Sequence, residues 1–151
     1  MILALAFALA TSASTVVIPE RRYDARLVRV VDGDTLSVQI TARATTRLPG
    51  QDVELSTAVV ETVRLAGVNA PETRGKCEAE KAAARAARLF LEDRLRGAKL
   101  ELVTRGEERE KFGRVIADVE VGGASVTQDL IQRGLADPYD GGKRDPMRWC
   151  R

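Results

Sequence analysis

One stretch decides the fold: Val63-Arg64-Leu65-Ala66-Gly67-Val68-Asn69-Ala70-Pro71-Glu72-Thr73. Its alternating apolar residues are typical of a β-strand, and Pro71 ends that pattern. Because proline fixes its own φ near about −65° and disfavours helical geometry in the residue before it, Glu72 leaves the strand end in a stiff direction. An arginine, an amide and a carboxylate at one strand end indicate a site. A strand that ends in a solvated turn is the simpler interpretation of this stretch alone.

Length and composition limit the classes of reaction that this chain could catalyse. A chain of 151 residues with a net charge of +2 predicts one compact domain, and any phosphate site must be a local cluster of cations. The sequence contains no histidine and two cysteines, which excludes Ser-His-Asp triads and the usual zinc sites. Catalysis would therefore depend on carboxylates, arginines and a hard cation bound by oxygen atoms.

The N-terminus has the pattern of an export signal. Residues 2–10 are apolar and residues 11–14 are small, a length that suits a signal-peptide core rather than a membrane span. We expect residues 1–14 to be a signal peptide, with an uncleaved N-terminal anchor as the alternative. Residues 22–151 would then form a single domain that is exported, either periplasmic or secreted, or tethered by the uncleaved segment.

Local patterns predict the remaining elements. Residues 25–40 read as a β-hairpin around Asp32-Gly33-Asp34, and residues 42–58 read as a long loop or an extended hairpin tip. Apolar residues at helical spacing (Ala83, Ala87, Leu91 and Leu95) predict a helix over 77–96, and strands are expected at 100–103 and 115–121. A short helix is expected at 126–133, before Gly134. This order predicts a mainly β fold, a five-stranded Greek-key barrel with one main helix inserted after strand 3 and a short C-terminal helix.

Four motifs occur in order along the chain. They are Val31-Asp32-Gly33-Asp34-Thr35, the stretch quoted above, Phe112-Gly113-Arg114 and Gln132-Arg133-Gly134-Leu135-Ala136. On these motifs the chain resembles the thermonuclease-like family, the staphylococcal-nuclease type of OB-fold. The resemblance covers residues 26–135.

The resemblance implies a Ca²⁺ site. Asp34 and Asn69 match positions that ligate calcium, and Ala70 matches a position whose backbone carbonyl reaches the metal. From the sequence alone, Asp34 could equally be an ordinary turn residue. Asn69 stands where the family usually has aspartate, so one negative charge is missing. Because Ca²⁺ affinity falls with ligand charge, we expect weaker calcium binding than in relatives with aspartate.

The resemblance also implies hydrolysis of phosphodiester bonds in DNA or RNA. Arg64 and Arg114 match the two arginines that bind the phosphate, and Glu72 matches the carboxylate that positions or activates water. Lys111 matches a contact to a neighbouring phosphate, and Tyr139 is expected to stack on a base. The chemistry also stands without the family, because guanidinium groups bind phosphate oxygens in pairs and a carboxylate can serve as general base.

The redox state of the two cysteines depends on the compartment in which the protein resides. If the chain is exported, Cys77 and Cys150 are expected to form a disulfide that ties the C-terminus to the start of the main helix. In the cytosol they would remain free thiols.

The leading hypothesis is an exported, monomeric nuclease with Ca²⁺ as cofactor, acting as an endonuclease or an exonuclease. Its partner would be nucleic acid, single-stranded or loosely paired, with little sequence preference, and no stable protein partner is implied. The alternative is a non-catalytic OB-fold module that binds nucleic acid or protein through the same groove, since a fold does not determine a function. The set Arg64, Glu72 and Arg114 favours the enzyme, because a binder of polyanions has no need of Glu72.

Overall fold

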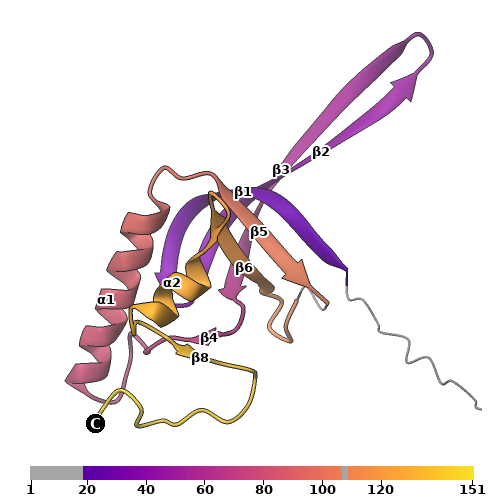
Figure 1. The fold of residues 1–151 in the computed structure, drawn as a ribbon. Helices are drawn as coiled ribbons and strands as arrows, with labels where there is room; N and C mark the ends of the chain where they lie inside the picture. The colour runs from indigo at the N-terminus through magenta and orange to yellow at the C-terminus, as the bar shows by residue number, and fades with distance from the viewer. Residues whose placement is uncertain (1–18, 107–108) are drawn as a thin grey trace, which may run out of the picture.

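The computed structural model describes residues 19–106 and 109–151, so the predicted signal segment, residues 1–14, lies outside the described residues. A mainly β fold with two helices is observed (Figure 1). The strands are β1 (Glu20–Asp32), β2 (Thr35–Leu48), β3 (Gln51–Leu65), β4 (Val68–Asn69), β5 (Leu100–Arg105), β6 (Val115–Val121), β7 (Ala124–Ser125) and β8 (Asp137–Pro138), and the helices are α1 (Glu78–Leu95) and α2 (Val126–Gln132).

Five strands form a closed ring. The sheet runs in the order β3-β2-β1-β5-β6-β7, and a parallel pairing between β3 and β6 joins its two sides. In that pairing Val63 lies opposite Val115 and Leu65 opposite Ala117. The predicted Greek-key architecture is therefore confirmed, and α1 follows β3 and the two-residue β4 as expected.

The core fills the ring with aliphatic side chains. Buried and partly buried residues alternate along β6, the two-residue period expected of a strand, whereas residues 35–38 at the start of β2 are all buried. Helix α1 covers the core through Ala84, Ala87, Leu91 and Leu95, so its buried stripe begins at Ala84 and not at the predicted Ala83. The largest fully buried side chains are Leu36, Leu65, Leu91, Leu95, Leu100, Leu102 and Leu130.

Residues 42–58 form an extended hairpin tip, which was one of the two predictions for this segment. Strands β2 and β3 stay paired from Thr35 with Arg64 out to Leu48 with Gln51, and Figure 1 shows the pair extending from the barrel as an arm. From residue 43 to residue 52 every side chain is exposed. The arm therefore adds hydrogen-bonded strand but no core.

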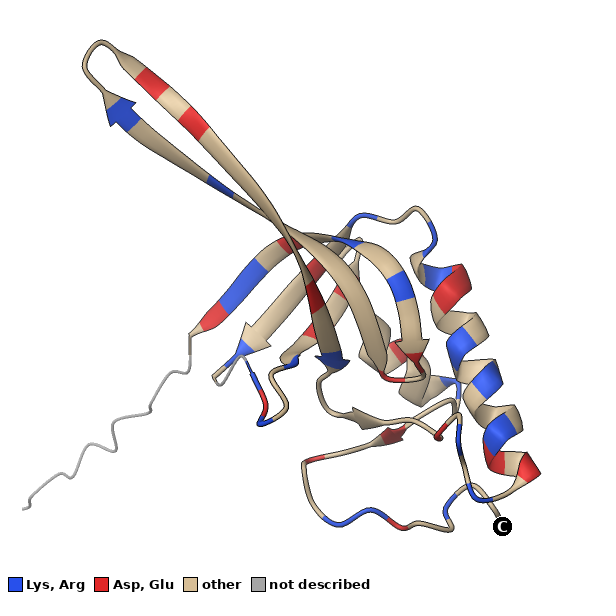
Figure 2. Ribbon diagram, turned by 180° about the vertical axis from the view of Figure 1, so that it is seen from behind, with Lys and Arg blue, Asp and Glu red and all other residues tan. Residues whose placement is uncertain are grey.

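The charged face of α1 is a solvated surface. Figure 2 shows Lys and Arg along the middle of this helix and Asp and Glu toward its two ends. Lys81 pairs with Glu78 at 2.8 Å and Arg88 pairs with Glu92 at 2.9 Å, spacings that place partners on one helix face. Neither helix of the described chain is long and apolar enough to cross a lipid bilayer.

Two contacts hold the C-terminal segment. β8 pairs with β4, which places Asp137 opposite Asn69, and the backbone N–H of Tyr139 donates to the carbonyl of Gly67 at 2.8 Å. Further along, the predicted disulfide between Cys77 and Cys150 is present, with the two Cα atoms 5.9 Å apart. Residues 139–150 therefore run along one end of the barrel and finish at the N-terminus of α1 (Figure 1).

Candidate functional site

The β1–β2 turn meets the end of β3 in a small polar cluster. The carboxylate of Asp34 forms an ion pair with the guanidinium of Arg64 and accepts the backbone N–H of Ala70 at 3.1 Å. Arg64 is buried and also donates to the carbonyl of Val68 at 3.0 Å. The structure thus brings together three of the predicted residues from two distant segments.

A close approach of backbone makes this cluster possible. Gly33 precedes Asp34, and a Cβ added at Gly33 would lie 2.8 Å from the Cβ of Ala70 and 3.1 Å from that of Ala87. Contacts under about 3 Å do not fit real side chains, so glycine is needed here to seat the turn against Ala70 and α1.

Asn69 borders this cluster with an unsatisfied acceptor. Its side-chain oxygen Oδ1 is buried and accepts no hydrogen bond. A buried acceptor without a partner costs about 1–3 kcal/mol, so it is rare outside functional sites. Asp34, Asn69 and the carbonyl of Ala70 all offer oxygen atoms, the ligand type that a hard cation such as Ca²⁺ prefers, and the Asp34 carboxylate is shared with the guanidinium of Arg64.

Arg114 reaches the same end of the barrel from β6. Its guanidinium is bound by the carboxylate of Glu110 and lies 3.4 Å from the hydroxyl of Thr35. This hydrogen bond to Glu110 raises the pKa of Arg114, and the same contact holds the pKa of Glu110 below its ordinary value of 4.5. Both groups therefore remain charged at neutral pH.

A groove of about 660 Å³ runs past these arginines. Arg64 and Arg114 line it together with Lys111 and Tyr139, so the structure brings these four predicted site residues to one groove. Phe112 also lines the groove and is 72% exposed, with the Lys111 ammonium 5.0 Å from its ring centre. The wall thus combines cations with accessible aromatic rings, the combination found in sites for single-stranded nucleic acid.

Glu72 lies at the border of this groove. Its carboxylate is 62% exposed and is 3.5 Å from the guanidinium of Arg144. The loop that carries it is held by Glu80, a buried carboxylate of α1 that accepts the backbone N–H groups of Lys76 at 2.8 Å and of Glu72 at 3.4 Å. Glu72 therefore lies beside Arg144. Among the described residues, no hydrogen bond or ion pair joins it directly to Arg64 or Arg114.

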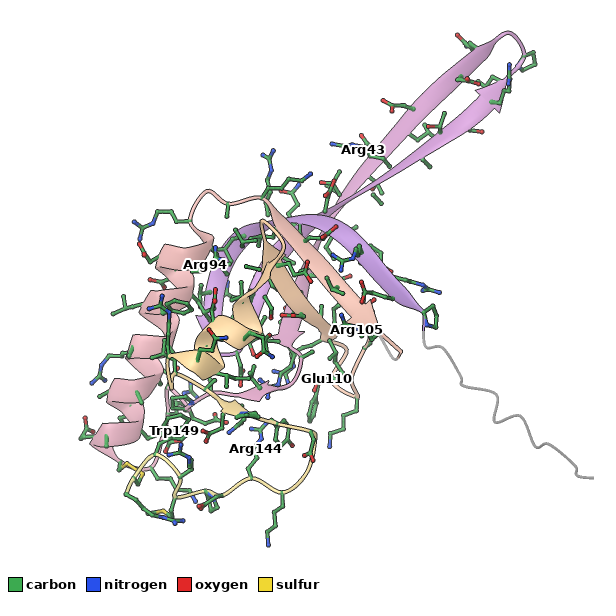
Figure 3. The ribbon with its side chains drawn as sticks, in the orientation of Figure 1. Arg43, Arg94, Arg105, Glu110, Arg144 and Trp149 are labelled. Carbon is green, nitrogen blue, oxygen red and sulfur yellow. A yellow bond between two sulfur atoms is a disulfide. The ribbon has the colours of Figure 1, made fainter. Side chains whose placement is uncertain are left out.

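The sequence did not single out Glu110, Arg144 or Glu80 as site residues. Figure 3 shows Glu110 and Arg144 at the same end of the molecule, and both line the groove. The spacing of four between Glu110 and Arg114 is a weak signal outside a helix. Arg144 lies on a segment without periodic pattern, so only the fold brings it to Glu72.

Comparison with known proteins identifies relatives. A family model described as staphylococcal nuclease homologue matches residues 62–147. The SPbeta prophage-derived endonuclease YokF of Bacillus subtilis (strain 168) is 31% identical over 114 residues, which is 75% of this chain and 33% of YokF. Endonuclease YncB of the same organism is 30% identical over 111 residues, 73% of this chain and 45% of YncB.

The chain spans less than half the length of either relative, so the shared part is a domain of each. The matched region includes the strand end, α1, the Phe112-Gly113-Arg114 turn and the segment that carries Arg144. The chain belongs to the staphylococcal nuclease homologue family.

Proposed function

We propose that this chain is an endonuclease that hydrolyses phosphodiester bonds of DNA or RNA. The observation that carries the proposal is the groove in which the guanidinium groups of Arg64 and Arg114 lie together, with Glu72 at its border. Its membership of a nuclease family and the two relatives named as endonucleases support the same reaction.

Two arginines in one groove suit a phosphate that gains charge during hydrolysis. Each planar guanidinium can donate two parallel N–H bonds to phosphate oxygens, which a lysine ammonium cannot do. In the free protein both are already oriented by carboxylates, Arg64 by Asp34 and Arg114 by Glu110. Donors fixed in advance stabilise the transition state without costly reorganisation.

Glu72 is the proposed base. Its exposed carboxylate can accept a proton from, or orient, the water that attacks phosphorus, and a positioned general base contributes about 10²–10⁴-fold to a rate. The backbone bonds from the loop to Glu80 hold Glu72 in place. The guanidinium of Arg144 lies 3.5 Å from the Glu72 carboxylate and orients it at the border of the groove.

A Ca²⁺ ion fits the all-oxygen set of Asp34, Asn69 and the carbonyl of Ala70, and the unpaired Oδ1 of Asn69 is the observation that supports this fit. When bound there, calcium would polarise a phosphate oxygen and neutralise charge on it. The set carries one formal negative charge, so we propose modest calcium affinity.

The side chains in the wall of the groove support the proposal that the substrate is single-stranded or loosely paired nucleic acid, bound with little sequence preference. Phe112 and Tyr139 line it, and unpaired bases of any sequence can stack on aromatic rings. We also propose that the chain acts as a monomer. The disulfide supports an oxidising compartment, hence export to the periplasm or medium.

The test is cleavage of single-stranded DNA and RNA by the purified, disulfide-intact chain, with calcium and with EDTA. We expect internal cleavage that calcium supports and EDTA abolishes. Binding without cleavage at millimolar calcium would favour the second candidate, a non-catalytic OB-fold module, for which the missing charge at Asn69 is the supporting observation.

A further inference from the structure

A second cavity of about 330 Å³ adjoins the groove. It lies between the loop after β4 and the C-terminal segment, and Glu72 and Trp149 line it. Arg144 lines both hollows, so the two meet at this side chain (Figure 3). Arg64 and Arg114 belong to the groove and Glu72 belongs to the second cavity, and the reacting phosphate of the proposed function would therefore lie at their junction.

A polynucleotide chain continues on both sides of its scissile phosphate. The groove with Lys111 and Tyr139 would hold the chain on one of these sides. We propose that the second cavity is a subsite for the nucleotide on the other side of the scissile phosphate, with Arg144 and Trp149 as its binding residues. This inference rests on the proposed function, and it deepens it, because a site with both subsites acts within a chain.

The charges of the cavity suit a sugar-phosphate backbone. Arg74, Lys76 and Arg144 are exposed cations that line it. Its carboxylates are largely engaged within the protein, since Glu80 accepts backbone N–H groups and Asp145 pairs with Arg151. A phosphate entering the cavity would therefore meet Arg74 and Lys76, and it would compete with Glu72 for Arg144.

An unsatisfied polar atom points to a ligand as well. The indole Nε1 of Trp149 is buried and without a hydrogen-bond partner, and Trp149 lines this cavity. An indole N–H is a donor, and the phosphate and base oxygens of a nucleotide are acceptors. Arg148 lies over the Trp149 ring, 4.8 Å from its centre, and fixes the orientation of the indole.

The disulfide keeps this wall in place. Trp149 immediately precedes Cys150, which is bonded to Cys77 at the N-cap of α1. The Tyr139 ring, with Arg144 at 4.9 Å from its centre, supports the other end of the segment. The subsite is thus built from residues that are anchored on both sides.

Trp149 provides a direct probe, because the sequence contains one tryptophan. We would titrate the disulfide-intact chain, in EDTA, with oligothymidylate eight residues long and follow tryptophan emission, while fluorescein anisotropy of the same oligonucleotide gives its binding curve. The emission is expected to change with the same midpoint as the anisotropy. Unchanged emission at concentrations that saturate the anisotropy would overturn the subsite.

Arg144→Ala and Lys143→Ala form a matched pair of charge deletions. Arg144→Ala is expected to weaken oligonucleotide binding about tenfold, the effect of losing one charge-assisted contact, whereas its neighbour Lys143→Ala should change it less than about twofold. Equal effects would contradict the subsite.

A parallel cleavage assay separates the two claims. Cleavage with silent Trp149 overturns the subsite alone. An emission response without cleavage overturns the nuclease and leaves the subsite standing.

Discussion

The guanidinium of Arg114 is bound by the carboxylate of Glu110, which precedes it by four residues and faces the same groove. A phosphate that takes Arg114 must therefore compete with a carboxylate already in place. Glu110 both orients the arginine and lowers the net positive charge of the groove. Its role can be measured, because removing its charge leaves the rest of the wall intact.

Glu110→Gln is expected to bind single-stranded oligonucleotide more tightly, by up to about fivefold, since a partly exposed ion pair contributes up to about 1 kcal/mol. Anisotropy in EDTA at low salt measures the effect. Glu61→Gln is the control, because Glu61 also pairs with an arginine, Arg109, but does not line the groove. Weaker binding by Glu110→Gln would mean that orientation of Arg114 outweighs competition.

The disulfide should stabilise the chain substantially. It closes a loop with a sequence separation of 73, for which the chain-entropy model gives about 4 kcal/mol. Cys77→Ser with Cys150→Ser is the suitable variant, because Cys77 Sγ accepts the N–H of Glu80 at the start of α1 and a serine hydroxyl can replace that bond. Urea unfolding measures the loss. A loss below about 1 kcal/mol would contradict this role of the crosslink.

Gly33 should be needed to hold Asp34 in its observed position beside Ala70. Gly33→Ala places a methyl group 2.8 Å from Ala70, and overpacking of this kind costs about 1–3 kcal/mol. Adding Ala70→Gly removes the clashing atom, so the double variant should be more stable than the sum of the single effects predicts. Urea unfolding of the three variants completes the cycle. Additive effects would show that the turn relaxes away from Ala70.

Asn69→Asp should bind calcium more tightly than the wild type. The substitution adds one negative charge to an oxygen donor set whose amide oxygen has no partner in the free protein. Calorimetric titration with calcium, without nucleic acid, measures the affinity. Gln51→Glu adds the same charge at the tip of the arm and serves as control. Equal affinities for wild type and Asn69→Asp would show that residue 69 is not a ligand.

Most of the fold could be predicted from local pattern. Helix α1 and strand β6 follow from apolar residues at regular spacing, and both are observed within one residue of their predicted ends. The pairing of β4 with β8 could not be predicted, because each strand has two residues and no periodicity. That pairing brings Tyr139 to the groove.

The candidate site was predictable where its residues belong to motifs of the family resemblance. The cluster of Asp34, Arg64 and Ala70 was expected from the family resemblance, and the structure joins it through hydrogen bonds across 36 residues. Arg144 and Trp149 carry no local signal. Their placement depends on the path of the C-terminal segment and on its crosslink to Cys77.

The most direct test of the proposed mechanism is the initial rate at which Glu72→Gln cleaves single-stranded DNA at saturating calcium. The control is Glu54→Gln, an exposed carboxylate on the arm. We predict that Glu72→Gln lowers the initial cleavage rate about 10²–10⁴-fold at unchanged oligonucleotide binding, and that Glu54→Gln cleaves at the wild-type rate. A wild-type rate for Glu72→Gln would contradict the assignment of Glu72 as the base.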